Sequence, residues 1–317
     1  MTTNRDSLFP ASTGGADLDL FGEVPLWTPE IEQVAGKIAH WIRCDLPGAA
    51  VQGVQRIGKS FCAEYLRRSV PDILGGTAVA FTWTIELAKA KGELETIRDW
   101  LSQSGYPAIN HNRIGVLKAR LYEHLISTAD AIGAKRIFLI IDEAHRAERE
   151  HLQILMILFN GLQQRGKKCF ALLLGEPKLQ QMRELYNNAD SLQIIGRFFS
   201  VEHEFRGIDP RRLVDLLDVV ETERQIASRY LPHLVAEGFL LHDLAPLYVN
   251  ALALLQSELM LVGNPRLPMQ HLRASLNNIV YELRDDPDRA LKLDENLVLR
   301  GLRSNGFHDV MQFFMGS

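Results

Sequence analysis

The sequence predicts an α/β fold in which a parallel five-stranded sheet is flanked by helices, followed by a small C-terminal all-helical region. Residues 136–141 and 169–174 form continuous apolar runs, which are typical of strands buried on both faces of a parallel sheet. Strand and helix patterns alternate up to about residue 207, which is the order of a doubly wound sheet. Beyond Pro210 only helical spacing remains.

The individual elements follow from local signals. Thr28 suits the N-cap and Pro29 the first position of a helix, which Pro47 and Gly48 end. Strand patterns cover residues 49–51, 77–83, 136–141, 169–174 and 194–205. Helical patterns cover residues 59–68, 92–104, 113–132, 149–165 and 178–187.

Three regions are expected along the chain. Residues 1–27 are acidic, rich in Gly, Ser and Thr, and without periodicity, so they predict a flexible arm. The alternative is a docking tail that meets a partner through Leu8, Phe9, Leu18, Leu20 and Phe21. Residues 28–207 form the predicted α/β domain, and residues 208–317 form the helical domain with a C-terminal tail.

Composition excludes several classes of protein. No run approaches 18 apolar residues, which excludes a membrane span, and the N-terminus lacks the order of a secretory signal. Three cysteines without CxxC spacing argue against a disulfide framework or a Cys-rich zinc site. The net charge of −4 excludes a globally basic nucleic-acid binder but leaves room for a local basic surface. We therefore expect a cytoplasmic protein with no membrane partner.

The strongest motif spans residues 53–60 and fits the P-loop pattern G-x-x-x-x-G-K-[ST], between a predicted strand and a predicted helix. Glycines let backbone N–H groups face phosphates, Lys59 places a positive charge on the β and γ oxygens, and Ser60 binds Mg²⁺. The expected nucleotide contacts are Gly53, Val54, Gln55, Arg56, Ile57, Gly58, Lys59, Ser60 and Phe61.

A second motif supports the first. The apolar run 137–141 ends in Asp142 and Glu143; Asp142 is suited to hold Mg²⁺ and Glu143 to orient and activate the attacking water. The expected cofactors are therefore ATP and Mg²⁺, and the reaction is hydrolysis. GTP is disfavoured because no complete [NT]-K-x-D motif follows, and the scattered histidines predict no further metal site.

Taken together, these motifs resemble those of AAA+ ATPases over roughly residues 28–305. More narrowly, "IIDEAH", "LLLGEPKL" and "GRFF" resemble the TnsC/TniB type, the target-selecting ATPases of Tn-seven-like transposons, including CRISPR-associated ones. The resemblance implies that Arg197 is an arginine finger acting on the neighbouring subunit. It also implies that Arg266 is the sensor-two arginine of a helical lid.

One position departs from the family pattern. The sensor-one position after the fourth strand normally carries a polar residue, but here Gly175 and Glu176 stand there. A carboxylate beside the γ-phosphate is electrostatically unfavourable, so Glu176 is expected either to point away or to lie next to Mg²⁺. We accordingly expect hydrolysis to be slow, or to depend on assembly or a partner.

The resemblance further implies an ATP-dependent regulator of DNA transposition. Such proteins form a homo-oligomeric ring or filament on double-stranded DNA, are placed by a target-recognition protein of TniQ or TnsD type, recruit the transposase, and disassemble on hydrolysis. The alternatives are a helicase-loader-like ATPase and a signalling NTPase, each acting on a protein client. The expected DNA contacts are Lys89, Lys91, Asn112, Arg113 and Lys118, although a solvated surface of mixed charge explains these residues nearly as well.

Overall fold

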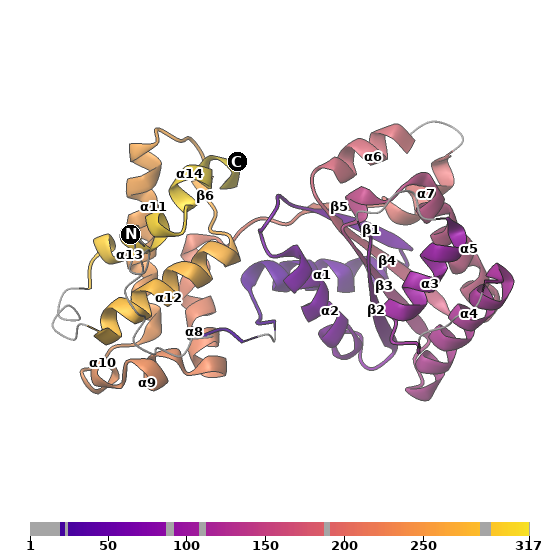
Figure 1. Ribbon diagram of the computed structural model, residues 1–317, viewed down its shortest axis with the longest axis horizontal. Coiled ribbons are helices and arrows are strands. Elements are labelled where there is room, and N and C mark those ends of the chain that lie inside the picture. Colours follow the sequence, from indigo (N-terminus) through magenta and orange to yellow (C-terminus); the bar gives the residue numbers. More distant parts are fainter. Residues whose placement is uncertain are drawn as a thin grey trace, which may run out of the picture.

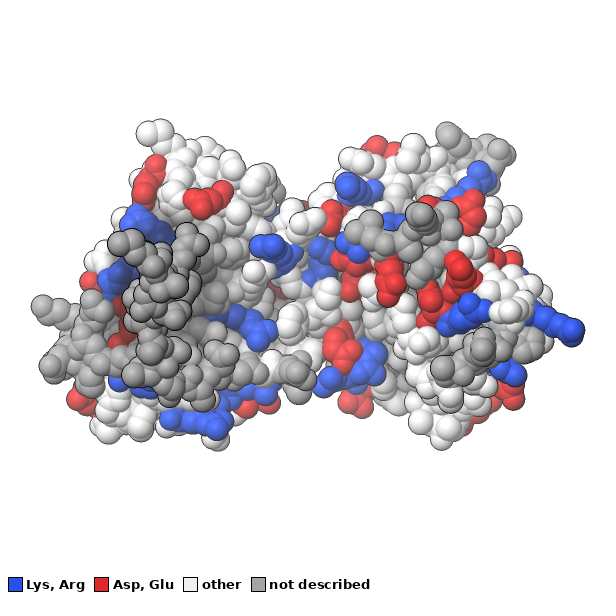
Figure 2. Space-filling view, viewed as in Figure 1, with Lys and Arg blue, Asp and Glu red and all other residues white. Residues whose placement is uncertain are grey.

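The computed structural model describes residues 20–22, 25–86, 92–107, 112–186, 191–285 and 293–316. They form an α/β region and a helical region, on the right and left of Figure 1, joined by the segment after the last strand of the sheet. Lys/Arg and Asp/Glu side chains are interspersed on the face shown in Figure 2, without segregation of one sign.

The sheet has five parallel strands in the order β2-β3-β4-β1-β5, which confirms the predicted fold class. The strands are β1 (Gly48–Gln52), β2 (Ala78–Thr84), β3 (Arg136–Asp142), β4 (Lys168–Gly175) and β5 (Glu202–Glu204). Because all strands run in the same direction, the segments after β1, β3 and β4 meet at one edge of the sheet.

Helices cover both faces of this sheet (Figure 1). The helices are α1 (Pro29–Arg43), α2 (Lys59–Ile73), α3 (Glu93–Gln103), α4 (Ile114–Ala131), α5 (Arg149–Gln164), α6 (Lys178–Tyr186) and α7 (Leu192–Phe198). Side chains of β3 alternate between the two cores: Phe138 and Ile140 join the cluster of α1 and α2, whereas Leu139 and Ile141 join that of α3, α4 and α5. The Thr28 hydroxyl accepts a hydrogen bond from Ile31 N at 3.2 Å, as an N-cap should.

The predicted strand over 194–205 is only partly correct. Residues 192–198 form helix α7, and strand β5 is limited to Glu202–Glu204. Ile194 and Phe198 are four residues apart and both buried, so they share one helical face, and Phe198 packs edge-on against Phe159 of α5 with ring centroids 5.5 Å apart. Arg197 therefore lies in the last turn of a helix.

The C-terminal region is almost entirely helical. It contains α8 (Leu213–Arg224), α9 (Ile226–Tyr230), α10 (Pro232–Ala236), α11 (Leu244–Glu258), α12 (Met269–Asp285), α13 (Glu295–Ser304) and α14 (Phe307–Val310). It also holds a two-stranded antiparallel ladder that the sequence did not predict, β6 (Asn264–Pro265) with β7 (Met315–Gly316). A 2.6 Å hydrogen bond between the buried Tyr248 hydroxyl and Ser275 Oγ ties α11 to α12.

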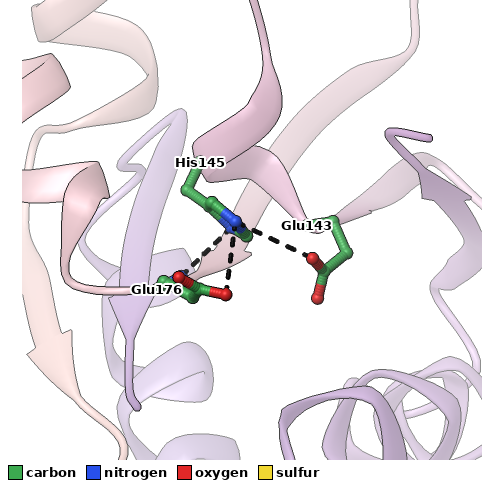
Figure 3. Close-up of side chains that lie close together, drawn as sticks. All are labelled: Glu143, His145 and Glu176. Atoms are coloured by element: carbon green, nitrogen blue, oxygen red, sulfur yellow. Dashed lines mark hydrogen bonds and ion pairs between the residues drawn. The ribbon is translucent and has the colours of Figure 1, made fainter. Parts of the chain in front are cut away.

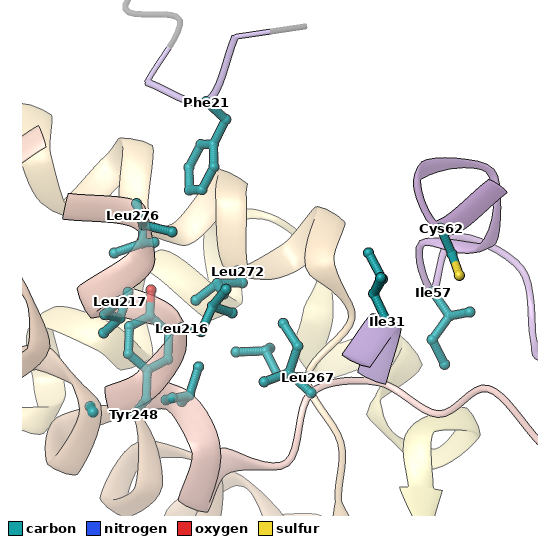
Figure 4. Close-up of a cluster of buried hydrophobic side chains, with 14 of the residues drawn as sticks. Phe21, Ile31, Ile57, Cys62, Leu216, Leu217, Tyr248, Leu267, Leu272 and Leu276 are labelled. Carbon is teal, nitrogen blue, oxygen red and sulfur yellow. The ribbon is translucent and has the colours of Figure 1, made fainter. Parts of the chain in front are cut away.

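Leu20 and Phe21, which the sequence assigned to a flexible arm, are buried at 2% exposure each. Figure 4 shows Phe21 above Leu276 of α12, in an apolar cluster that continues past Leu267 to Ile31. These two side chains are buried because they cover apolar surface of their own chain, so they are not displayed for a partner. The rest of the acidic segment, residues 1–19, 23 and 24, lies outside the described residues and includes Leu8, Phe9 and Leu18.

Cys44 is an exposed free thiol, and Cys62 and Cys169 are buried free thiols. In the part of the chain that the structure describes, no helix combines the length and apolar character needed to cross a membrane.

Candidate nucleotide site

The P-loop connects the end of β1 to the first residue of α2, and two of its glycines are required by geometry. Gly58 has a φ of 114°, a left-handed conformation that other residues adopt only with strain. A Cβ on Gly53 would lie 2.5 Å from the carbonyl oxygen of Phe205, so no side chain fits there. The loop is thus pressed against the segment that follows β5.

Lys59 is the first residue of α2, and its side chain is buried at 6% exposure. Its Nζ donates hydrogen bonds to the carbonyls of Gly53 and Val54, at 2.8 and 2.7 Å. Burial lowers the pKa of Lys59, while nearby carboxylates, Glu143 foremost, oppose that shift. Because its bonded partners are neutral carbonyls, the positive charge remains available to an anion.

A cavity of about 750 Å³ opens beside the loop. It is lined by the loop, by the segments after β3 and β4, and by α12, through Gln55, Arg56, Gly58, Lys59, Ser60, Phe61, Glu143, Arg146, Glu176, Met269, Gln270, Arg273, Ala274 and Asn277. Four of these side chains are cationic and two are carboxylates, a balance that favours a polyanionic ligand.

Three predicted contacts take other places. Gly53 is buried and Val54 is half-buried, and neither lines the cavity. Ile57 lines a smaller adjoining cavity of about 30 Å³, together with Phe205 and Met269.

The acidic pair lies at the end of β3. Asp142 is 5% exposed, and its Oδ1 accepts a hydrogen bond from Glu143 N at 2.9 Å. Glu143 has a φ of 55°, and its Oε2 is 2.8 Å from a guanidinium nitrogen of Arg146. Glu143 reaches the cavity, but its carboxylate is held in an ion pair within its own segment.

His145 lies between two carboxylates that come from neighbouring strands (Figure 3). Its Nε2 is 3.8 Å from Glu143 Oε2 and 3.5 Å from Glu176 Oε1. Its Nδ1 accepts a hydrogen bond from Glu176 N at 3.3 Å, which places the ring proton on Nε2, facing both carboxylates. Burial lowers the pKa of His145, so the ring is neutral at neutral pH. The sequence did not predict this cluster, because the histidines were considered without the order of the strands.

Glu176 points into the cavity. Its Oε1 accepts a hydrogen bond from Gln55 Nε2 at 2.8 Å. Burial raises the pKa of Glu176, but the hydrogen bond from Gln55 and the positive charge of Lys59 outweigh that effect, and the net pKa lies below its usual value. The carboxylate at the position after β4 is therefore ionised and adjoins the P-loop.

With this geometry described, comparison with known proteins is informative. Residues 48–182 match the family model of an AAA domain. This chain contains an AAA-type P-loop ATPase domain. No protein with curated annotation matches the sequence significantly.

Solved structures resemble most of this chain in fold. The Aeropyrum pernix ORC2 protein in ADPNP–ADP complexes has a TM-score of 0.53 at 14% identity, covering 89% of this chain and 69% of that chain. Its ADP form has a TM-score of 0.50 with the same identity and coverage. Domain III of the Thermotoga maritima replication initiation protein DnaA has a TM-score of 0.45 at 10% identity, covering 92% and 98%. At these identities the ORC2 likeness concerns the fold alone.

The predicted sensor-two residue, Arg266, lies outside the matched residues and does not line the nucleotide cavity. It directly follows β6, and its Nη1 is 3.0 Å from Asp209 Oδ2. The side of α12 that lines the cavity instead repeats every fourth residue, at Met269, Arg273 and Asn277. Arg273, one turn into α12, is thus the arginine that the helical region contributes.

Arg197 lies at the opposite edge of the sheet from the P-loop. Its carbonyl oxygen abuts Gly48 at the amino end of β1, and the P-loop begins at the carboxyl end, roughly 15 Å away along the strand. Arg197 is therefore remote from the cavity of its own subunit, and its action on a neighbouring subunit remains a prediction.

The predicted DNA contacts are only partly described. Lys89 and Lys91 lie outside the described residues. Asn112 Oδ1 accepts a hydrogen bond from Arg98 at 3.2 Å, and Lys118 forms an ion pair with Glu93. Arg113 is the N-cap of α4. The structure thus assembles no cluster of basic side chains from the described members of this set.

Proposed function

We propose that the chain binds ATP with Mg²⁺ in the cavity between the P-loop and α12, and hydrolyses it. The observation that carries the proposal is that Lys59, Glu143 and Arg273 line a single cavity although they are far apart in the sequence. Ser60 and Asp142 are the residues suited to hold Mg²⁺, which supplies positive charge to the phosphate oxygens. The buried ammonium with neutral partners and the excess of cations fit a triphosphate.

The chain's own residues divide the work of hydrolysis. Lys59 binds phosphate oxygens, and Glu143 orients a water molecule and accepts its proton after its carboxylate leaves Arg146. His145 lies between Glu143 and Glu176, with its Nε2 facing both carboxylates. An ionised Glu176 at the cavity wall disfavours phosphate, which supports slow hydrolysis that depends on assembly or a partner.

A substitution of Glu143 tests this division. Glu143→Gln should retain ATP binding but slow single-turnover hydrolysis by about 10²- to 10⁴-fold, whereas Glu150→Gln, an exposed residue of α5, should change neither. Glu176→Gln should raise the single-turnover rate. An unchanged rate in Glu143→Gln would show that Glu143 does not act in hydrolysis. An unchanged rate in Glu176→Gln would show that the charge of Glu176 at the cavity wall does not slow hydrolysis.

We further propose that this ATPase regulates DNA transposition, as the resemblance to the TnsC/TniB type implies. ATP-bound subunits assemble on double-stranded DNA as a ring or filament, a TniQ- or TnsD-type protein places the assembly, and the transposase is recruited to it. The position of Arg197, remote from its own cavity, supports a site that a neighbouring subunit completes. Hydrolysis then releases the subunits.

Imaging with duplex DNA tests this function. With ATP or a slowly hydrolysed analogue, the protein should form large assemblies on nonspecific duplex in negative stain, and the binding should weaken steeply with salt. Lys59→Ala should abolish assembly, and Lys168→Ala, an exposed lysine paired with Asp45, should not. A protein that stays a single subunit under all these conditions contradicts the proposal. Assembly only with a protein client would favour a loader, and copurified ADP with no DNA response would favour a signalling NTPase.

A further inference from the structure

A small cavity of about 30 Å³ continues from the nucleotide cavity and shares four of its lining residues, Gly58, Phe61, Met269 and Arg273. Its wall is mostly apolar, with Ile57, Phe205 and Ile208 on one side and Phe21 and Leu26 on the other. If the P-loop holds the phosphates, this cavity is where the base of the same nucleotide extends. Its volume holds about one water molecule, so side chains of the wall must turn to admit a base.

Phe61 is the exposed aromatic ring of this wall, and the Arg273 guanidinium lies between it and the buried ring of Phe21. The Arg273 guanidinium carbon is 5.0 Å from the ring centroid of Phe21 and 5.3 Å from that of Phe61, and Phe61 is 41% exposed. A planar cation over two aromatic rings occupies a place suited to a planar ring system. The apolar wall supplies area for a base but does not distinguish one purine from another.

Glu30 provides the one carboxylate among the described residues that line this cavity. It lies in the first turn of α1, is 9% exposed, and its Oε1 accepts a hydrogen bond from Asp209 N at 3.3 Å. Its Oε2 is buried and has no hydrogen-bond partner. A buried acceptor without a donor is costly and rare in folded proteins, so this oxygen requires an explanation.

The other polar groups of the wall are already engaged. The Thr28 hydroxyl caps α1, and Arg206 is paired with Glu204. Arg266, whose charge acts on Glu30, does not line this cavity; its Nη1 pairs with Asp209, and its buried Nε has no hydrogen-bond partner. Glu30 also lines a neighbouring hollow with Asp209 and Arg266. Among the described residues of this wall, its Oε2 is the buried side-chain acceptor that has no hydrogen-bond partner.

We propose that Glu30 determines base specificity by accepting a hydrogen bond from the 6-amino group of adenine. An ionised carboxylate offers only acceptors, and the 6-oxo group of guanine or hypoxanthine is also an acceptor. Above the pKa of Glu30, about 7, the same oxygen therefore repels those bases. This inference rests on the proposed ATP binding and adds the group that selects the base. A hydrogen bond to a charged acceptor corresponds to about 10- to 100-fold in affinity.

The test compares three triphosphates on the full chain at pH 8, where Glu30 is ionised, each competing with a fluorescent ATP analogue. ATP carries the 6-amino group, inosine triphosphate carries a 6-oxo group, and purine riboside triphosphate carries only hydrogen at that position. Wild-type protein should bind ATP about 10- to 100-fold more tightly than either analogue. In Glu30→Gln the amide offers a donor to the 6-oxo group, so the ratio of ATP to inosine triphosphate affinity should fall towards one or invert. Glu32→Gln is the matched control, because Glu32 is an exposed acid of the same turn and pairs with Arg212.

The outcomes separate this inference from the proposed function. Equal wild-type affinity for all three triphosphates overturns the role of Glu30 and leaves ATP binding intact. The role of Glu30 is also overturned if Glu30→Gln melts at a lower temperature but keeps the wild-type ratio of ATP to inosine triphosphate affinity. Glu30 would then be a structural partner of Asp209 and Arg266. No binding of any triphosphate to wild-type protein overturns both proposals. Equal wild-type affinities overturn the inference even if the variant fails to fold.

Discussion

The close approach of the P-loop to the segment after β5 makes Gly53→Ala the most informative substitution. The added Cβ would lie 2.5 Å from the Phe205 carbonyl oxygen and 3.3 Å from Ile57 Cγ2. Both backbones are fixed, because Gly53 N donates to Gly175 O at 3.0 Å and Phe205 N donates to Gln52 O at 2.7 Å. The loop must therefore shift by roughly half an ångström, and overpacking of this kind costs about 1–3 kcal/mol of unfolding free energy. The same shift moves the phosphate cradle, so ATP affinity should fall by about tenfold.

Urea unfolding and calorimetric titration with ATP measure the two effects. Gly36→Ala is the matched control, because an added Cβ there has no atom within 4 Å and Gly36 lies within α1. It should stabilise the protein by about 0.5–1 kcal/mol and leave ATP affinity unchanged. If Gly53→Ala were as stable as the wild type and bound ATP equally well, the argument from close packing would be refuted.

Three further predictions concern charged side chains. Arg146→Gln should release the Glu143 carboxylate from its ion pair, which contributes about 1 kcal/mol or less because both side chains are partly exposed. Basal ATP hydrolysis should therefore rise by up to about fivefold. A lower rate would show that the ion pair is not inhibitory. Arg197→Ala should leave the ATP affinity of dilute protein unchanged but remove the rise of turnover with protein concentration, an effect of about 10³-fold or more; equal loss at every concentration would contradict action between subunits. Burial raises the pKa of Glu30 from 4.5 to about 7, so its contribution to stability is fully present below pH 4.5 and lost as the pH rises through about 7. Glu30→Gln should accordingly unfold at higher urea than the wild type at pH 8, by up to about 3 kcal/mol, with the difference shrinking towards pH 4.5; a difference independent of pH would contradict the shifted pKa.

Local signals were sufficient for the sheet and the P-loop. Two long apolar runs and a motif of fixed spacing need no tertiary information to be recognised. The secondary structure of segment 194–199 was harder to predict. Adjacent apolar pairs such as Ile194–Ile195 and Phe198–Phe199 fit both the helical period of 3.6 residues and the strand period of 2. Packing of Phe198 against α5 decides in favour of the helix.

The site beyond the P-loop depended on tertiary structure. Arg266 and Arg273 are seven residues apart in the sequence, and only the orientation of α12 shows which of them reaches the cavity. The cluster of Glu143, His145 and Glu176 exists because β3 and β4 are parallel neighbours that end side by side. Strand order would have indicated it, because residues that follow adjacent parallel strands meet.

Glu30 left no signal in the sequence. An acid in the first turn of a helix is ordinarily a solvated residue that complements the helix dipole. Its burial results from the Asp209 segment, which donates a backbone hydrogen bond to it across 179 positions of sequence. A contact of that range becomes visible only when the helical region is folded onto the α/β region.

Calorimetric titration of the full chain with ATP and Mg²⁺ tests the central claim most directly, with Lys59→Ala and Lys168→Ala measured alongside. The account predicts one ATP bound per chain in the wild type and in Lys168→Ala, and binding lost in Lys59→Ala. Absence of binding to the wild type, or equal binding to all three proteins, would contradict it.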